Sequence, residues 1–454
     1  MKIIIAGGGK VGAALVRQLS AEGHDLMVID TSRRVLDDIA GQYDVLGMQG
    51  NCAAMPVLLE AGVKDAQLLI AATSADEVNL LCCTTAHGVN PALHTIARIR
   101  NPEYTDQIYA MRDLFGLSLV VNPEQQTAIE IERLLRYPGF LKRDTFAKGR
   151  AEIVELRVDA NSRLCNAALL DLPKIVGCRV LVCAVLRGGK AITTNSGDFV
   201  LRENDRVFFT APARTLDTLL KNLGIVTRRA NRVMLCGGGR VSYYLAKRLE
   251  KSGISLQIIE NNHERAMQLA ELLPHACIIE GDASSQTLLD SEGLDQCSAL
   301  VTLTGLDELN MILSIYGSGR GVPQVITKLG HADISGVYDA LPIGSVLCPK
   351  ELCATGIVRY VRAMQNQSGA ALTLHTIADG QVEALEFAVG NAPYCGVPLK
   401  ELKARLRRSV LLACISRGRE VEIPNGDSCL RPGDTVVVVT SGENRIGQLS
   451  DIFA

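Results

Sequence analysis

The chain has no tryptophan, and aromatic residues make up only 4% of its 454 residues. It therefore offers few rings on which nucleic-acid bases could stack. Its formal net charge of −2 also provides no basic surface for a phosphate backbone. These two shortages argue against a nucleic-acid partner.

Long hydrophobic runs are missing too, although 47% of the residues are apolar. The longest runs have the length of a strand, such as the valines at 436–439, whereas a membrane-spanning helix needs about 20 apolar residues. The N-terminal segment MKIIIAGGG enters a glycine turn too early to be a signal peptide. We expect a cytoplasmic protein without a membrane span.

Motifs for metal ligation are also lacking. The chain has 14 cysteines but no CxxC, and 7 histidines but no HExxH. In a chain of this length, such cysteines are typical of buried, reduced thiols in the cytosol. We therefore expect no metal site and no disulfide framework.

A repeat is the main feature that the sequence does contain. The segment Ile3–Asp30, IIIAGGGKVGAALVRQLSAEGHDLMVID, returns as Val233–Glu260, VMLCGGGRVSYYLAKRLEKSGISLQIIE. Each copy predicts a strand, a glycine-rich turn, a helix and a second strand that ends in a carboxylate. This pattern is the dinucleotide-binding fingerprint, and it occurs twice.

The residues of the first copy suit a bound nucleotide. Side chains at Gly7 and Gly9 would block a pyrophosphate from the backbone N–H groups at the start of the helix. A side chain at Gly12 would hold the helix away from the strand. Asp30 can accept hydrogen bonds from ribose hydroxyls and would repel a 2′-phosphate, which favours NAD or an adenosine nucleotide over NADP.

Later strand-like runs place further polar residues at the same sheet edge. The carboxyl ends of successive parallel strands meet where open α/β sheets bind ligands. The candidate contacts at strand ends are Asn51, Thr73 and Arg98 in the first copy, and Asp282, Thr304 and Lys328 in the second.

A second repeated unit follows each nucleotide-binding copy. AEIVELRV at 151–158 matches VEALEFAV at 382–389, and CAVLRGGK matches ACISRGRE. Alternating apolar residues, an RGG or RGR hairpin and a GD turn predict a small α+β domain. The fold class is therefore α/β, with two Rossmann-like, doubly wound parallel-sheet domains at 1–124 and 230–348, each followed by a small α+β domain at 144–228 and 368–454.

An amphipathic helix that opens with proline links the domains of each pair. The first begins at Pro123 and carries an apolar stripe that includes Leu134 and Leu135, and its counterpart begins at Pro349. Such a helix either covers only its own sheet or also packs on another copy of the domain. A solitary domain would leave these stripes in water. Two tandem units in one chain supply one pair of such faces, and we expect several chains to bury the remaining faces in a homo-oligomer, a tetramer of chains with dimers as the smaller stable unit.

The domain order, both glycine loops, the acidic strand ends and the GD-turn domains resemble the TrkA family of potassium-uptake regulatory proteins, which have two tandem RCK units. The resemblance covers essentially the whole chain. It implies a ring of domains on the cytoplasmic face of the inner membrane, docked on a separate potassium-transporter pore and controlled by NAD, NADH, ATP or ADP. The implied nucleotide contacts are Gly7, Gly9, Val11, Asp30, Thr73 and Arg98, with Gly237, Gly239, Val241, Glu260, Thr304 and Lys328 in the second copy; the neighbouring Gly8, Lys10, Cys52, Ser74, Gly238 and Arg240 complete the candidate sites.

The second copy departs from the first at several of these positions. Ser242 replaces Gly12 and is expected to push helix and strand apart, while Lys328 replaces Arg98 and offers a flexible point charge in place of a two-pronged donor. We therefore expect the two sites to differ, with tighter binding at the first.

An NAD-dependent oxidoreductase is the alternative function, because dehydrogenases carry the same fingerprint. Tyr243 and Lys247 have the spacing of a proton-donating pair, but they lie on the helix after the glycine loop, which directs them away from the nicotinamide. A third hypothesis is a nucleotide sensor that acts on a protein other than a pore. No catalytic residue is predicted.

Overall fold

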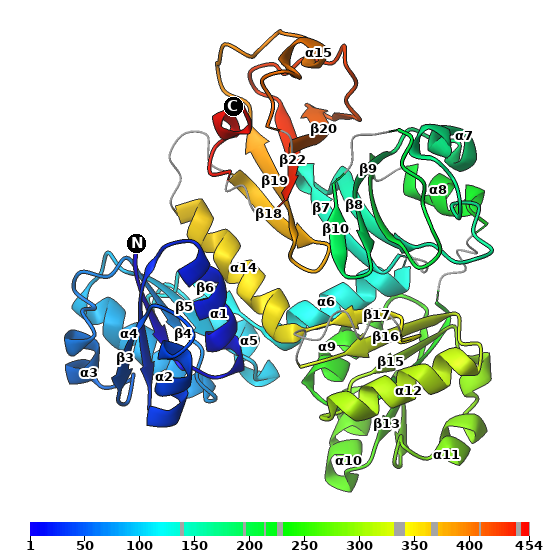
Figure 1. Cartoon of the computed structure of the whole chain (residues 1–454). Coiled ribbons are helices and arrows are strands. Elements are labelled where there is room, and N and C mark those ends of the chain that lie inside the picture. The colour runs from blue at the N-terminus through cyan, green and yellow to red at the C-terminus, as the bar shows by residue number, and fades with distance from the viewer. Residues whose placement is uncertain are drawn as a thin grey trace. The chain divides into compact units, whose positions relative to one another are not determined.

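The computed structural model describes residues 1–136, 140–193, 197–212, 215–224, 230–330, 341–364, 371–407, 410–441 and 446–453. The chain forms two compact units. The first contains Met1–Ile129, Gly239–Leu245 and Leu347–Tyr360; the second contains Glu130–Gly238, Ala246–Val346 and Val361–Ala454. Figure 1 colours these segments by residue number.

The first nucleotide-binding domain is built on a six-stranded sheet with the order β3-β2-β1-β4-β5-β6, and every described pairing is parallel. Its strands are β1 (Lys2–Ala6), β2 (Asp25–Asp30), β3 (Leu46–Gln49), β4 (Leu68–Ala71), β5 (His94–Arg98) and β6 (Leu119–Val121). Its helices are α1 (Lys10–Ala21), α2 (Arg33–Ala40), α3 (Met55–Glu60), α4 (Asp76–Val89) and α5 (Pro102–Met111).

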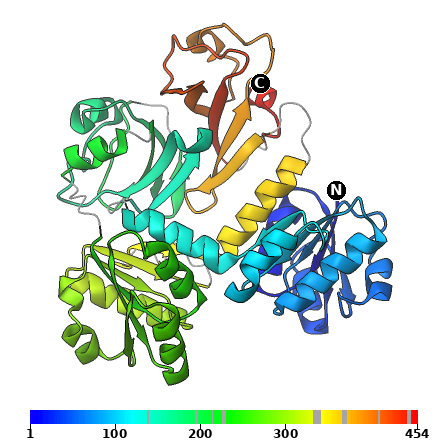
Figure 2. The same ribbon diagram turned by 180° about the vertical axis from the view of Figure 1, so that it is seen from behind.

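The second nucleotide-binding domain repeats this order as β14-β13-β12-β15-β16-β17. Its strands are β12 (Arg232–Cys236), β13 (Ser255–Glu260), β14 (Cys277–Glu280), β15 (Ala299–Thr302), β16 (Gln324–Lys328) and β17 (Ser345–Leu347). Its helices include α9 (Arg240–Leu249), α10 (His263–Leu272), α11 (Gln286–Ser291) and α12 (Asp307–Gly319). Figures 1 and 2, which face opposite sides, show helices on both faces of each sheet, as a doubly wound fold requires.

Each small domain has a five-stranded sheet whose described pairings are antiparallel, in the orders β10-β9-β11-β8-β7 and β18-β19-β22-β20-β21. The first contains β7 (Lys142–Phe146), β8 (Ala151–Arg157), β9 (Leu181–Arg187), β10 (Lys190–Ile192) and β11 (Arg206–Pro212), with α7 (Leu172–Val176) and α8 (Leu216–Asn222). The second contains β18 (Ala371–Ile377), β19 (Val382–Ala388), β20 (Val410–Arg417), β21 (Glu420–Glu422) and β22 (Thr435–Ser441), with α15 (Leu399–Leu402).

The repeated turns of the small domains have the same anchor. The guanidinium of Arg187, beside the predicted RGG hairpin, donates two hydrogen bonds of 2.7 and 2.8 Å to Asp205, just before the last strand. Arg417 makes the same pair of bonds to Asp434, at 2.8 and 2.9 Å. The predicted hairpin is therefore tied to the turn before the last strand in both copies. The expected fold class is confirmed.

The two linking helices pack on the other copy's nucleotide-binding domain. Helix α6 (Pro123–Arg136) accepts a 2.8 Å hydrogen bond at Leu134 O from Gln324 of β16. Helix α14 (Pro349–Met364) places Glu351 2.7 Å from Arg17 of α1. The wider of the two expectations for these helices, contact with another copy of the domain, is confirmed within a single chain.

This packing supplies one pair within the chain, as expected, but it leaves none of these stripe residues for a second chain to cover. Leu134 and Leu135 have no exposed surface, and Ile357 and Val361 of α14 have none either. A tandem repeat brings both copies into one molecule, so the partner surface is supplied internally. The apolar stripes therefore carry no argument for an oligomer.

Candidate functional site

The two glycine loops lie where the strand order of each sheet reverses. In the first sheet, β1 is flanked by β2 on one side and β4 on the other, so the loops after β1 and β4 diverge at their carboxyl ends. Open α/β sheets bind ligands in the crevice at this point. The sequence predictions of Gly7 and Thr73 fall on these two loops.

Gly7 and Gly12 are glycines because the backbone leaves no room. Gly7 has φ +100°, and a Cβ there would lie 2.9 Å from the Thr73 nitrogen. A Cβ on Gly12 would lie 1.9 Å from the Gly7 carbonyl oxygen, which confirms close packing of α1 on the loop. A Cβ on Gly9 would meet nothing within 4 Å. The space in front of Gly9 is therefore open to a ligand.

Asp30 fastens the glycine loop to the end of β2. One carboxylate oxygen accepts a 2.7 Å hydrogen bond from the Gly8 N–H, and the other accepts a 2.8 Å bond from the Ser32 N–H. A carboxylate has about four lone-pair sites. Asp30 thus holds the loop and keeps acceptor capacity for ribose hydroxyls.

The second glycine loop has the same geometry. Gly237 has φ +108°, and its Cβ would lie 2.9 Å from the Leu303 oxygen. Glu260 accepts a 2.7 Å bond from the Gly238 N–H and a 2.8 Å bond from the Asn262 N–H. Space is again open in front of Gly239. The extra methylene of Glu260 leaves these contacts unchanged.

Two buried asparagines, which the sequence reasoning missed, hold the ends of β4 and β15. Asn79 accepts hydrogen bonds from the backbone N–H and the hydroxyl of Thr73, at 2.8 and 2.7 Å, and donates to Arg98 O at 2.8 Å. Asn310 repeats these bonds to Thr304 and to Lys328 O, at 2.9, 2.8 and 2.9 Å. Each asparagine lies six residues after its threonine, in TSADEVN at 73–79 and TGLDELN at 304–310, and this shared spacing was the available signal.

Arg98 and Lys328 end β5 and β16, and each contacts the end of the neighbouring strand in its own domain. An Arg98 guanidinium N–H donates to Thr73 O, whereas the Lys328 ammonium donates to Leu303 O at 3.2 Å. Burial lowers the pKa of Arg98. Its Nε is buried without a hydrogen-bond partner among the described residues. An anion at this edge would satisfy that donor and recover part of the desolvation cost.

The remaining predicted residues fall into three groups. Lys10 and Arg240 are exposed at the first position of α1 and α9, near the phosphate approach. Val11 and Val241 are 5% and 7% exposed, so only their backbone can face a ligand. The side-chain oxygens of Asn51 and Asp282 each accept a local backbone N–H, at 3.0 and 2.8 Å, and the bond from Ser284 lowers the pKa of Asp282. Ser74 is exposed, whereas Cys52 is buried.

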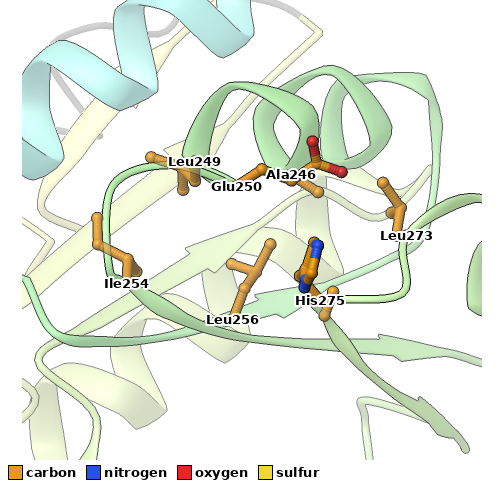
Figure 3. A pocket seen from close by; sticks show the side chains of 8 residues that line it. Ala246, Leu249, Glu250, Ile254, Leu256, Leu273 and His275 are labelled. Atoms are coloured by element: carbon orange, nitrogen blue, oxygen red, sulfur yellow. The ribbon is translucent and has the colours of Figure 1, made fainter.

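A surface hollow lies away from these loops. Figure 3 shows its lining residues, among them Leu249 of α9, Leu256 of β13 and His275. Because Leu256 is near the amino end of β13, the hollow is at the opposite sheet edge from the Gly237 loop. It is not part of the candidate nucleotide site.

Two further kinds of feature, a metal-binding cluster and a membrane-spanning helix, were sought among the described residues. Across the described ranges, no three histidine, cysteine or carboxylate side chains are grouped to hold a metal ion. Among the same residues, no helix combines the length and apolar character needed to cross a bilayer.

Comparisons with known proteins match the whole repeat. The TrkA-N domain model matches residues 3–123 and 233–349, and the TrkA-C domain model matches 153–224 and 384–454. The Trk system potassium uptake protein TrkA of Halomonas elongata is 29% identical over 100% of this chain and 98% of its own. A TrkA homolog of Archaeoglobus fulgidus is 30% identical over the full length of both chains.

The fold also matches a solved channel structure. A structure of the GsuK channel bound to NAD covers 97% of this chain and 77% of its own, with a TM-score of 0.60 and 17% identity. At that identity the similarity concerns the fold.

Proposed function

The chain belongs to the TrkA family, with two tandem TrkA-N and TrkA-C units, and on this premise we propose that it is a nucleotide-binding regulatory subunit that gates a separate membrane potassium-uptake transporter. The effector is NAD or NADH, with ATP or ADP as the competing ligands. The protein acts at the cytoplasmic face of the inner membrane, because a chain of this kind must reach the pore that it controls. The curated relatives carry a potassium-uptake name over their full length, which supports the transporter as the target.

One observation carries the nucleotide part of the proposal. In both loops a strand-end carboxylate accepts the N–H of the middle glycine at 2.7 Å, while a Cβ on Gly9 or Gly239 would meet no other atom within 4 Å. The backbone is thus held ready at a helix N-terminus, where N–H groups and the helix dipole favour a pyrophosphate. The structurally similar GsuK channel has been solved with bound NAD, which supports the proposal of a dinucleotide ligand.

Regulation follows from the coupling of each site to its neighbours. A ligand shifts an equilibrium only through different affinities for the two conformations, usually by about 1–3 kcal/mol. Helices α6 and α14 each begin after the last strand of one nucleotide-binding domain and contact the other copy. They offer a physical route by which nucleotide at one loop alters the other copy.

We also propose that several chains form a closed ring, a tetramer. The support comes from equivalent helices: Leu81 of α4 is 56% exposed and Ile312 of α12 is 63% exposed. Leu81 lies two residues after Asn79, as Ile312 does after Asn310. Exposed apolar groups at equivalent positions favour contact with another copy. Glutamate at both positions should lower the mass measured by light scattering without unfolding the chain.

The decisive experiment is a pull-down from membranes with the full chain, followed by potassium uptake in cells that carry each variant. We expect a multi-spanning potassium transporter to co-purify. We also expect Gly9→Val to abolish the response of uptake to NADH while co-purification persists. The absence of any transporter from the pull-down would contradict the gating role.

The oxidoreductase alternative has its own readout. The protein is incubated with NADH and candidate acceptors while absorbance of the reduced nicotinamide is followed. Lys247, half of the only proton-donating pair that the sequence offered, forms a 3.0 Å ion pair with Glu250. We expect no turnover. Catalytic oxidation of NADH that Gly9→Val abolishes would replace the regulatory proposal with an enzyme.

A further inference from the structure

A single hydroxyl joins the helix of the second glycine loop to the first nucleotide-binding domain. Tyr244 lies in the second turn of α9, the helix that starts directly after Gly239. Its hydroxyl donates a 3.0 Å hydrogen bond to Arg100 O and accepts one of 2.9 Å from the side-chain amide of Asn122. The hydroxyl of Thr105, 3.2 Å away, is a third partner. These three partners all belong to the first copy of the repeat.

The contacts of Tyr244 are shielded from water. Tyr244 and Asn122 are 7% and 4% exposed. Burial raises the pKa of Tyr244, so its hydroxyl remains a hydrogen-bond donor. The segment Gly239–Leu245, which contains this tyrosine, belongs to the same compact unit as Met1–Ile129. The start of α9 is therefore attached to the first domain by directional bonds whose loss would leave buried polar groups unpaired.

Arg100 connects Tyr244 to the first nucleotide site. It lies two residues after Arg98, at the carboxyl end of β5. Its backbone N–H donates a 2.8 Å bond to Asp76 at the start of α4, and its guanidinium donates to Ser74 O. Arg98 and Ser74 are both candidate nucleotide contacts. A displacement of Arg100 O would therefore be felt at the ends of β4 and β5, where the first site lies.

Asn122 connects the same hydroxyl to the linking helix α6. Its side-chain oxygen accepts a 2.9 Å bond from the Gln125 N–H in the first turn of that helix, and its backbone oxygen accepts one of 2.9 Å from the Gln126 N–H. Asn122 thus caps α6 with its oxygens and holds Tyr244 with its amide nitrogen. The start of α6 and the end of β5 meet at one hydroxyl that α9 carries.

The helix of the first glycine loop cannot make this contact. Ala14 stands at the equivalent position of α1, two residues after Gly12, as Tyr244 is two residues after Ser242. Ala14 is 5% exposed, so a small apolar residue suffices to pack the helix there. The packing of α9 on its own sheet therefore does not explain the tyrosine, whereas its bonds to the first domain do.

We propose that Tyr244 couples the two nucleotide sites, as a positioning residue that acts through Arg100 and Asn122. A pyrophosphate at the second loop would bind the backbone N–H groups at the start of α9 and fix the helix that carries Tyr244. The hydroxyl then holds Arg100 O, and with it Ser74, in the arrangement described above. Nucleotide at one loop should therefore strengthen binding at the other, by the same factor in both directions because a coupling free energy is reciprocal. This inference rests on the proposed binding of nucleotide at both loops.

The test is calorimetry of the full chain with NADH. Because the first loop is expected to bind more tightly, the weaker event in the unmodified chain reports the second loop while the first is occupied. In Gly9→Val the remaining event reports the second loop while the first is empty. We expect the second loop to bind at least about fivefold more weakly in Gly9→Val, the lower end of ordinary coupling between sites. In the Tyr244→Phe background, Gly9→Val should leave the affinity of the second loop unchanged.

Three variants separate coupling from packing. Tyr244→Phe keeps the ring and removes only the hydroxyl. Tyr243→Phe is the matched control, because it removes the hydroxyl of the neighbouring, partly buried tyrosine, and it should keep the full effect of Gly9→Val. Asn122→Asp retains an acceptor for the Gln125 N–H but removes the amide donor to Tyr244, and it should abolish the effect as Tyr244→Phe does. Thermal unfolding checks that each variant is folded.

The outcomes distinguish this inference from the proposed function. A tyrosine with only a structural role would lower the melting temperature of Tyr244→Phe and leave the effect of Gly9→Val intact, which would overturn the coupling role. The same conclusion would follow if Gly9→Val did not weaken the second loop of the unmodified chain, or if Tyr243→Phe abolished the effect equally. Two binding events without coupling would leave the nucleotide-binding proposal standing. A folded chain that binds no NADH at either loop would remove both proposals.

Discussion

The two nucleotide-binding domains surround nearly identical backbone contacts with different side chains. In both, a carboxylate accepts the middle glycine N–H at 2.7 Å and a buried asparagine binds the threonine at the next strand end. They differ in the residue that packs under the loop, Gly12 or Ser242, and in the cation beside it, Arg98 or Lys328. The loop framework is thus common to both domains, and we expect the nucleotide affinity of each proposed site to depend on the residues around it.

Closing the open space at Gly9 should have the largest effect. Gly9 has an extended backbone, with φ −65° and ψ −168°, and a Cβ there meets nothing within 4 Å, so Gly9→Val should fold normally. Its side chain would occupy the approach to the loop. We expect at least hundredfold weaker NADH binding at the first site, about 2.7 kcal/mol. Calorimetry should lose the tighter of two binding events.

The matched variant Gly239→Val should remove only the weaker event, because the second loop has the same open space. If Gly9→Val removed the weaker event instead, the ranking of the two sites would be wrong.

Gly12→Ser places in the first domain the residue of the second. Because its Cβ would lie 1.9 Å from the Gly7 oxygen, the helix must shift. Overpacking of this kind costs about 1–3 kcal/mol. Thermal unfolding should show the loss. Gly88→Ser is the control, since that helical glycine has no atom within 4 Å of its Cβ. Equal melting temperatures for the two variants would show that Gly12 is not required by packing.

The carboxylates should select against a 2′-phosphate. We expect NADP to bind at least about tenfold more weakly than NAD at the first site, or about 1.4 kcal/mol, since two negative groups repel there. Asp30→Asn retains a hydrogen-bond acceptor for the glycine loop. It should reduce the ratio of the NAD affinity to the NADP affinity. Glu260→Gln tests the second site in the same way. Titration of each variant with both dinucleotides measures the ratios, and equal affinities for NAD and NADP in the unmodified chain would refute the selection.

The exchange of the two cations should have the smallest effect. Arg98→Lys replaces a planar, two-pronged donor with a point charge, and we expect a loss of about 1 kcal/mol in binding at the first site. Lys328→Arg should strengthen the second by a similar or smaller amount. The double variant should bring the two affinities closer together, as read by calorimetry. If the double variant left the difference between the two affinities unchanged, that difference would be assigned to Gly12 and Ser242 instead.

Much of the candidate site could be predicted because its residues lie at the ends of strands that the sequence pattern identifies. Gly7, Asp30 and Arg98 fall at the ends of short, apolar, strand-like runs, and parallel strands bring such ends to one edge. Asn79 was missed because its role depends on two loops that only the folded sheet places on either side of it.

The sequence alone determined the repeat and the doubly wound parallel sheets, and it predicts the kind of ligand that suits the glycine loops, because these depend on short-range periodicity and on residue chemistry. It did not determine where the linking helices pack. Leu134 and Ile357 are apolar whether they face another chain or another part of this one, since hydrophobic burial has no direction. Only the tertiary structure, by closing α6 and α14 over the other copy's domain within one chain, decided that these surfaces are already covered.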